Sequence, residues 1–363
     1  YFANQNTSGK TISEKTSQKL DYINKLIDAK FLNKVNESDL EDGIYKGLLE
    51  GLNDPYSVYY TAEEYRKMME QTSGTYSGIG ALVSQNAETG IITVVKAFAD
   101  APAAKAGVKN GDIIYKVKGK EVTGVDINNV VTEMKGEKGT TVDITVYRES
   151  EKKYIDFTIT RDQVNEPTVE YKMLDKKKKI GYIQISQFEE VTYDQFTKAL
   201  DDLKKQGMKA VIFDVRSNPG GLYETVCKML DEILPEGNLV STKDKYGNEE
   251  KQTSDSKCLD MPMVVLQNKD SASASEIFAG AIQDFNAGKI VGTQSFGKGI
   301  VQTILPLSDG SAVKLTVQDY YTPSGKNIHG KGITPDVEAE LEENATSDTQ
   351  LEKAKETIME LMK

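Results

Sequence analysis

A regular alternation of short apolar runs and amphipathic segments in the second half of the chain constrains the fold most. Strand-like runs lie at 180–185, 210–215, 263–266 and 289–291, and segments with helical spacing lie between them at 196–207, 222–233 and 275–285. In the run 210–215 every residue except Asp214 is apolar, which is typical of a strand buried on both faces. This alternation predicts a layered α/β domain with a largely parallel sheet. Two further strands are expected around 300–307 and 312–317.

The hydrophobic period is different in the first half of the chain. Residues 1–75 have helical spacing, with one apolar stripe formed by Leu20, Ile23, Ile27 and Phe31. This stripe is either core or a pairing surface between two chains. Ser38 to Glu41 fits a capping box and predicts the start of a second helix there. Residues 76–163 instead contain mostly β-like runs, so they predict a small separate β domain.

These changes predict a mixed α/β, multi-domain chain with four parts. An N-terminal helical region covers 1–75, the β domain covers 76–163, the α/β core covers 164–340, and a C-terminal helix covers 341–363. The 363 residues are long enough for two or three domains.

Composition excludes several classes of function. Asp and Glu number 56 against 45 Lys and Arg, so the net charge is −11 and a nucleic-acid-binding surface is not expected. With one His and two Cys, a structural zinc site and a disulfide framework are excluded, although a single Cys227–Cys258 bridge is possible. Residues 1–10 contain no signal-peptide core, so the protein is either cytosolic or exported through a segment outside this sequence.

Three loops that follow strands of the α/β part are candidate sites, because ligands in such folds bind at the carboxyl ends of strands. They are 216–221, 270–276 and 292–299. In the second loop a strand leads directly into a helix, which places Ser273 beside free helix N–H groups that can stabilise an oxyanion. The alternative is structural, because Ser273 with Glu276 also fits a simple capping box.

The third loop, 292–299, can be interpreted in two ways. Gly292 and Gly297-Lys298 match part of a phosphate-binding loop, but Gly299 replaces the Ser/Thr that holds Mg²⁺, and a β-rich run follows where a helix is needed. Otherwise Lys298 is a lysine between glycines. Burial lowers the pKa of a lysine, and a Ser–Lys pair then performs acyl transfer without histidine. The alternative without a catalytic role is that Lys298 is a surface lysine in a flexible turn. His329 is expected at the surface or in a substrate cleft.

Together these segments resemble the carboxyl-terminal processing proteases, which are tail-specific Ser–Lys peptidases with an inserted PDZ domain. The resemblance extends from about residue 40 to 340. It rests on six motifs in the family's order, at 51–57, 103–112, 214–221, 271–276, 296–302 and 321–325. It implies a ClpP/crotonase-like α/β core that carries the PDZ domain and an N-terminal helical region.

The resemblance also implies roles for individual residues. Ser273 would be the nucleophile, Lys298 the base and Gln302 the residue that orients this lysine. Backbone N–H groups of Ala274 and of the Gly220-Gly221 turn would form the oxyanion hole. In an extended strand Lys298 and Gln302 would lie about 13 Å apart, so we expect the chain around Lys298 to coil back.

In the PDZ-like part, the resemblance implies that Gly78, Ile79 and Gly80 bind a peptide carboxylate through their N–H groups. An apolar face would flank the groove or pack in the core, or both; it comprises Ile127, Val130, Val131 and Met134.

The function implied is that of a serine endopeptidase, working without metal or cofactor, that cleaves unfolded or extended proteins with free C-termini. An extracytoplasmic location, possible membrane anchoring and a possible homodimer through the N-terminal helices are implied as well. Two alternatives stay open: a catalytically silent PDZ-containing scaffold that binds peptides, and a nucleotide-binding protein that uses Gly292 to Lys298.

Overall fold

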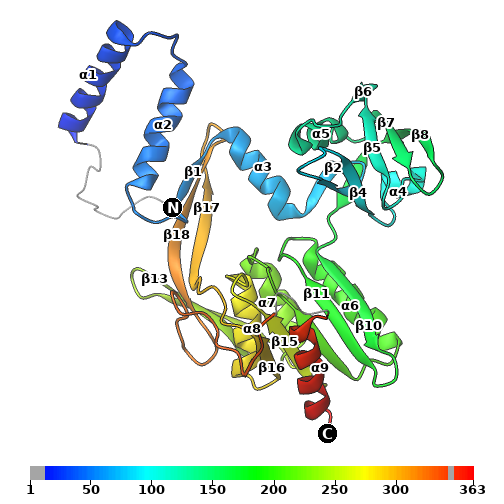
Figure 1. The fold of residues 1–363 in the computed structure, drawn as a ribbon. Helices are drawn as coiled ribbons and strands as arrows, with labels where there is room; N and C mark the ends of the chain where they lie inside the picture. The colour runs from blue at the N-terminus through cyan, green and yellow to red at the C-terminus, as the bar shows by residue number, and fades with distance from the viewer. Residues whose placement is uncertain (1–12, 342–346) are drawn as a thin grey trace. The chain divides into compact units, whose positions relative to one another are not determined.

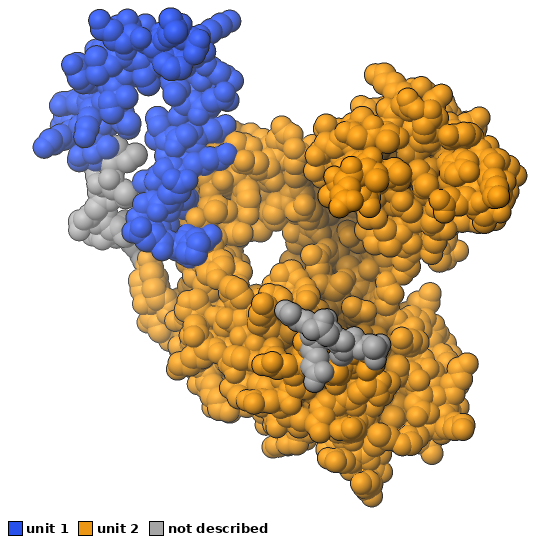
Figure 2. All heavy atoms as spheres, viewed as in Figure 1, with its two compact units in different colours: residues 1–55 blue, residues 56–363 orange. Residues whose placement is uncertain are grey.

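The computed structural model describes residues 13–341 and 347–363. These residues belong to two compact units, which span residues 1–55 and 56–363 (Figure 2). The expectation about a signal peptide in residues 1–10 lies outside the described residues.

The first unit contains helices α1 (Glu14–Lys30) and α2 (Glu37–Glu50). Helix α2 begins earlier than the capping box at Ser38 predicted, so that prediction is wrong. The Asn36 side chain accepts the N–H of Ser38 at 3.2 Å and caps the helix instead. In the apolar stripe, Ile23 and Phe31 are exposed, 42 % and 58 %, whereas Leu20 and Ile27 are partly buried.

The second unit begins with a strand and a helix. Strand β1 (Val58–Tyr60) is followed by α3 (Ala62–Ser73). Thr61 and Glu64 form a reciprocal capping box, with distances of 2.8 and 3.2 Å. Helix α3 ends at Gly74, which has a left-handed φ of 66°. The chain then enters β2 (Thr75–Gly78), which pairs with β9 (Asp162–Asn165).

A small β domain lies between β2 and β9. Its antiparallel sheet has the order β3 (Ala81–Gln85), β4 (Ile92–Ala97), β5 (Ile113–Val117), β7 (Thr141–Arg148) and β8 (Lys153–Thr160), with β6 (Lys120–Glu121) beside β5. Helices α4 (Pro102–Ala106) and α5 (Ile127–Met134) complete it. It has its own buried core, distinct from that of the α/β part.

The α/β part is built on a six-stranded sheet (Figure 1). Its strands, in spatial order, are β10 (Val169–Asp175), β11 (Ile180–Ile185), β12 (Ala210–Asp214), β15 (Met263–Gln267), β16 (Gly288–Gly292) and β19 (Val337–Glu338). All neighbouring pairs are parallel except β10 with β11. The predicted mixed α/β fold with a largely parallel sheet is therefore confirmed.

Both faces of this sheet are covered. Helices α6 (Thr192–Lys205), α7 (Tyr223–Asp231) and α8 (Ala274–Asp284) share a core with Val211 and Phe213, while α9 (Thr349–Leu361) packs on the other face with Ile212. Because neighbouring residues of β12 point to opposite faces, the whole strand is buried, and its first four residues are apolar. Each such fully buried side chain stabilises the fold by about 1.5–3 kcal/mol.

A second sheet adjoins the α/β part. It has the order β1, β18 (Ala312–Tyr321), β13 (Gly237–Asp244) and β14 (Glu249–Ser254), and β17 (Ile300–Pro306) also pairs with β18. Strands β17 and β18 lie where the sequence predicted them. The sequence did not predict β1, β13 or β14, because β14 is almost entirely polar and exposed and β1 has only three residues.

Helix α9, expected from the sequence, is linked to the core by a partly buried arginine. Arg216 donates to Asp214 at 2.6 Å and to Asp348, the N-cap of α9, at 2.8 Å. Cys227 and Cys258 are both free thiols, so the bridge left open by the sequence is not formed. In the described part of the chain, no helix is long and apolar enough to cross a membrane.

Candidate active site

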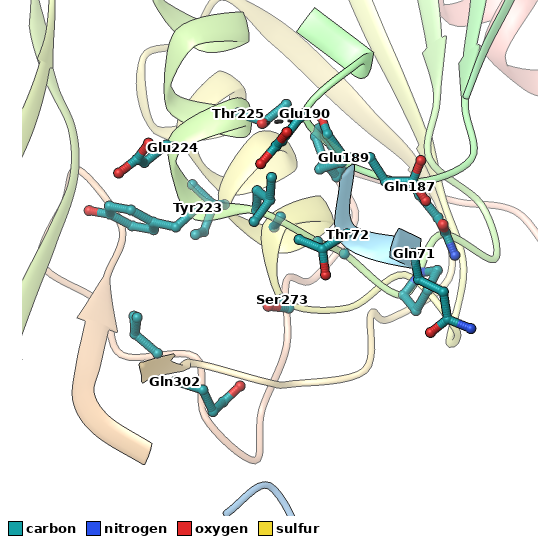
Figure 3. Close-up of a pocket in the computed structure, with 18 of the residues that line it drawn as sticks. Gln71, Thr72, Gln187, Glu189, Glu190, Tyr223, Glu224, Thr225, Ser273 and Gln302 are labelled. Carbon is teal, nitrogen blue, oxygen red and sulfur yellow. Dashed lines mark hydrogen bonds between the residues drawn. The ribbon is translucent and has the colours of Figure 1, made fainter. Parts of the chain in front are cut away.

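A cavity of about 970 Å³ contains most of the site residues expected in the core (Figure 3). Ser273, Ala274 and Gln302 line it together with Gly220 and Gly221. Its other walls come from α3, α6, α7, β17 and β18. Residues separated by some 80 positions in the sequence thus meet at one opening beside the carboxyl ends of the central strands.

Ser273 occupies a strained position at the start of α8. Its φ is +56° and its ψ −114°, which a residue other than glycine rarely adopts. Such a conformation costs about 1–3 kcal/mol and persists where the surroundings hold it in place. The preceding loop is held by Ser271, whose Oγ donates to Val215 O at 2.8 Å, and by the Ala272 N–H, which donates to Asn218 O at 3.0 Å.

The glycine turn approaches Ser273 so closely that it excludes a side chain. A Cβ on Gly220 would lie 2.8 Å from Ser273 Cβ and 3.0 Å from Ala274 N, and its φ of 107° also favours glycine. The Gly220 N–H, however, donates to Asn218 Oδ1 at 2.8 Å. The N–H groups of Gly221 and Ala274 are therefore the better candidates for an oxyanion hole.

One carboxylate joins the Ser273 turn to the segment that carries Lys298. Glu276 is fully buried, and its Oε2 accepts the N–H groups of Ser273 at 2.9 Å and of Lys298 at 2.8 Å. Its Oε1 accepts the Ser295 hydroxyl at 2.5 Å and the Gly297 N–H at 2.6 Å. Four donors satisfy the buried charge, so Glu276 fixes the spacing of the two segments.

The Lys298 side chain is directed toward Tyr56. Its ammonium lies 4.5 Å from the centre of the Tyr56 ring, and among the described residues Lys298 is not part of the cavity lining that includes Ser273. Residues 294–299 form an irregular loop with Gly297 at φ 91°, not the expected helical turn. Gln302 lies in β17, at a bulge, and its side-chain amide donates to Thr316 Oγ1 at 3.3 Å.

The phosphate-loop alternative does not fit this geometry. The N–H groups of Gly297 and Lys298, which a phosphate would need, are already bound to the Glu276 carboxylate, and strand β17 follows instead of a helix. His329 is exposed, as expected. Within residues 13–341 and 347–363, no group of three His, Cys, Asp or Glu side chains could hold a metal ion.

Sequence reasoning missed two contributors to the site. Glu276 was assigned only to a helix cap, although a carboxylate three residues after a candidate nucleophile at a helix start was visible in the sequence. Tyr320, buried in β18, donates from its hydroxyl to Ser273 O at 3.2 Å. Burial, and secondarily Glu276, raise the pKa of Tyr320, so its hydroxyl stays protonated. No pattern in the sequence indicated this tyrosine.

In the β domain, the predicted carboxylate loop connects β2 and β3. Gly80 has a φ of 76°, and the carbonyls of Ile79 and Gly80 accept the N–H groups of Ala103 at 2.7 Å and Phe98 at 3.0 Å. On α5, Val130 and Met134 are buried in the domain core, whereas Ile127 and Val131 are partly buried. The apolar face of α5 thus contributes to the core and leaves two residues as candidates for a groove.

Comparison with known proteins identifies the family. Residues 179–339 match Peptidase family S41, residues 77–159 match a PDZ domain, and residues 2–64 match the N-terminal domain of the activating protease CtpB. A CtpA-like serine protease of Staphylococcus aureus strain MRSA252 is 37 % identical over 341 residues, which cover 93 % of this chain and 67 % of that protein. The chain belongs to the S41 peptidase family.

Other members agree with this assignment. A CtpA-like serine protease of Staphylococcus epidermidis is 38 % identical over 324 residues, covering 88 % of this S41 chain and 65 % of the relative. The photosystem II D1 C-terminal processing protease has 28 % identity and a TM-score of 0.53, with 94 % of this chain and 91 % of that chain covered. A Bacteroides fragilis protein described as an S41 protease shares the fold, with 16 % identity, a TM-score of 0.57, and 88 % and 90 % coverage.

Proposed function

We propose that this chain is a serine endopeptidase that uses Ser273 as nucleophile and Lys298 as general base. The observation that carries the proposal is the strained Ser273 at the start of α8, pressed against Gly220 in a large cavity. Family membership supports it. The chain spans about 65 % of the length of the Staphylococcus epidermidis relatives, so we propose the peptidase activity for this part of the protein.

The chemistry proceeds by acyl transfer. Uncharged Lys298 takes the Ser273 hydroxyl proton as Oγ bonds to the substrate carbonyl carbon, and the carbonyl oxygen becomes an oxyanion. The N–H groups of Ala274 and Gly221 stabilise that oxyanion, each typically by about 3 kcal/mol. The C–N bond then breaks, Lys298 returns the proton to the leaving amine, and water releases the acyl group by the same route.

This mechanism requires Lys298 to leave the Tyr56 ring and enter the cavity. The backbone around the lysine is held by hydrogen bonds, among them Gly330 N–H to Gly297 O at 2.8 Å and Tyr320 N–H to Gly299 O at 3.0 Å. Glu276 also keeps the Lys298 backbone near the nucleophile turn, so the movement is one of the Lys298 side chain. Gln302, one of the residues that line the cavity, would then orient the lysine.

The substrates would be unfolded or extended proteins with free C-termini. The PDZ-like domain would bind the terminal carboxylate at Gly78, Ile79 and Gly80 and gate or feed the chain toward Ser273. The partly exposed apolar stripe of α1 supports pairing of two copies through the N-terminal helices. An extracytoplasmic location, with or without a membrane anchor, remains part of this proposal.

The test is incubation with an unstructured protein and identification of fragments by mass spectrometry. The unmodified protein should produce fragments and Ser273→Ala should not, while both bind a peptide with a free C-terminus. Binding without cleavage by the unmodified protein would instead support the catalytically silent scaffold. The position of the Lys298 ammonium over Tyr56 is the observation that favours this second candidate.

A further inference from the structure

Glu189 lies beside the nucleophile but has no part in the mechanism above. The preceding residue, Phe188, donates its N–H to Gly220 O at 2.9 Å and accepts the Leu222 N–H at 2.6 Å. Because Gly220 is packed against Ser273, this pairing places Glu189 in the wall of the same cavity, as Figure 3 shows. A substrate bound across Ser273 would therefore pass close to Glu189.

The Glu189 side chain is buried and has an unmet need for a hydrogen-bond donor. It is only 5 % exposed, and its Oε2 is sealed from solvent without a hydrogen-bond partner. This oxygen is pressed against the end of α3, since a Cβ on Gly74 would lie 2.3 Å from it. Burial, and secondarily Glu166, raise the pKa of Glu189 to about 7. A buried carboxyl in this state gains from a donor supplied by a ligand.

The backbone of Glu189 is held firmly, so the carboxyl is a fixed feature of the wall. Its N–H donates to Thr192 Oγ1 at 2.9 Å, and its carbonyl accepts the Thr225 hydroxyl at 3.2 Å. Since only Oε2 is sealed, the other carboxyl oxygen is the one that can meet a ligand in the cavity.

The charged side chains next to Glu189 in the cavity wall are acidic. Glu190 and Asp194 line the cavity next to Glu189, on the segment that leads into α6. The described lysines of the lining, Lys228 and Lys314, belong to α7 and β18. The segment 189–194 is therefore an acidic strip along one wall, with Glu189 as its buried member.

We infer that Glu189, flanked by Glu190 and Asp194, forms a subsite that selects a lysine or arginine side chain of the polypeptide bound across Ser273. The inference rests on the proposed function, because its ligand is the substrate of that reaction. A cationic side chain donates its N–H groups to the unsealed oxygen of the carboxyl and offsets its charge in a partly desolvated wall. A neutral or acidic side chain leaves the carboxyl without a partner or adds repulsion. Glu189 would thus determine specificity without taking part in bond breaking.

The test is a series of unstructured peptides with one cleavage site. In each peptide one position on either side of the scissile bond carries Lys, Arg, Gln or Glu, and kcat/KM is measured by mass spectrometry. At one position, Lys and Arg should be preferred over Gln by roughly tenfold. Glu189→Gln should abolish this preference. The control Glu236→Gln removes one exposed charge outside the cavity lining and should behave like the unmodified protein.

The outcomes separate this inference from the proposed function. Cleavage with no preference for Lys or Arg at any position, or a preference that survives Glu189→Gln, overturns the inference and leaves the peptidase intact. Absence of cleavage counts against the peptidase. The subsite is then tested by fluorescence anisotropy. The affinities of the Lys and Gln peptides are compared for Ser273→Ala and for the double variant that also carries Glu189→Gln, and a preference for the Lys peptide that the double variant loses supports the subsite. If Glu189→Gln fails to fold, Glu190→Gln should weaken the preference about two- to threefold, and an unchanged preference would contradict the subsite.

Discussion

The Ser273 turn and the Lys298 segment, the two halves of the proposed catalytic pair, are held in different ways. The Ser273 turn is fixed through Asn218, Gly220 and Glu276, and its strained φ is held at +56°. The backbone of Lys298 is fixed by Glu276, and its ammonium lies over the Tyr56 ring, outside the lining of the cavity. The proposed nucleophile is therefore held in the cavity by the fold, whereas the proposed base has to move into the cavity before it can react.

This difference indicates where activity can be controlled. Moving Ser273 would require breaking several buried hydrogen bonds, each costing about 1–3 kcal/mol if left unpaired. Moving the Lys298 side chain involves leaving the Tyr56 ring, a contact that contributes about 0.5–1 kcal/mol at an exposed site and about 2 kcal/mol when desolvated. Rotation of this side chain breaks none of the backbone hydrogen bonds that hold the loop, so we expect control of activity to act on Lys298 and not on Ser273.

The largest effect is expected from removal of the base. Lys298→Ala should lower kcat by roughly a thousandfold or more, measured on an unstructured protein, because no histidine is placed to replace it. Lys331→Ala, an exposed lysine near the same loop, is the control and should keep activity. If His329→Ala abolished cleavage while Lys298→Ala did not, the assignment of the base would be wrong.

Removal of the charge that joins the two halves should have the next largest effect. Glu276→Gln replaces a carboxylate that accepts four hydrogen bonds by an amide that places a donor among donors. We expect kcat to fall ten- to a hundredfold and the unfolding free energy to fall by about 1–3 kcal/mol. Urea unfolding and the cleavage assay measure the two effects. An unchanged kcat would show that the spacing of the two segments is set elsewhere.

Glu189 predicts a pH dependence of stability. A carboxyl whose pKa is raised from about 4.5 to about 7 binds its proton more tightly in the folded state, so the folded state loses stability as pH rises through this range. Glu189→Gln should therefore raise the unfolding free energy by about 1–3 kcal/mol at pH 8 and change it little at pH 4. Urea unfolding at both pH values measures this, and an equal effect at both would contradict the titration of Glu189.

The smallest effect is expected from the ring that holds the lysine. Tyr56→Leu removes the aromatic face, so the Lys298 ammonium should reach the cavity more often and kcat should rise about two- to fivefold. Tyr56→Phe keeps a ring and should stay near the unmodified rate. A fall in kcat for Tyr56→Leu would mean that the ring positions Lys298 for reaction instead of holding it away.

Sequence predicted the parts of the molecule that are governed by local patterns. The buried strand Ala210–Asp214 follows from its hydrophobic run, and the structure confirms it. The family resemblance placed Ser273, Gly220 and Gln302 in one site, and the structure brings them into one cavity. Their catalytic roles remain predictions.

What sequence could not supply depends on contacts between distant segments. The direction of the Lys298 side chain depends on Tyr56, some 240 residues earlier, and the place of Tyr320 depends on the register of β18. The helix start at Asn36 instead of Ser38 shows that a capping motif also competes with nearby residues of similar chemistry. Neither side-chain direction nor strand register is encoded in a local window.

The Arg216 pairing has a consequence for the last helix. Arg216 neutralises the buried carboxylate of Asp214, two residues before it, and also holds Asp348 at the start of α9. If α9 dissociated from the sheet, the Arg216 guanidinium would lose Asp348 as a counter-ion. The apolar face of the sheet that Ala354 and Ile358 cover would become exposed. Undocking of α9 would therefore remove one of the two carboxylates that hold Arg216, the residue directly before the turn that carries Gly220.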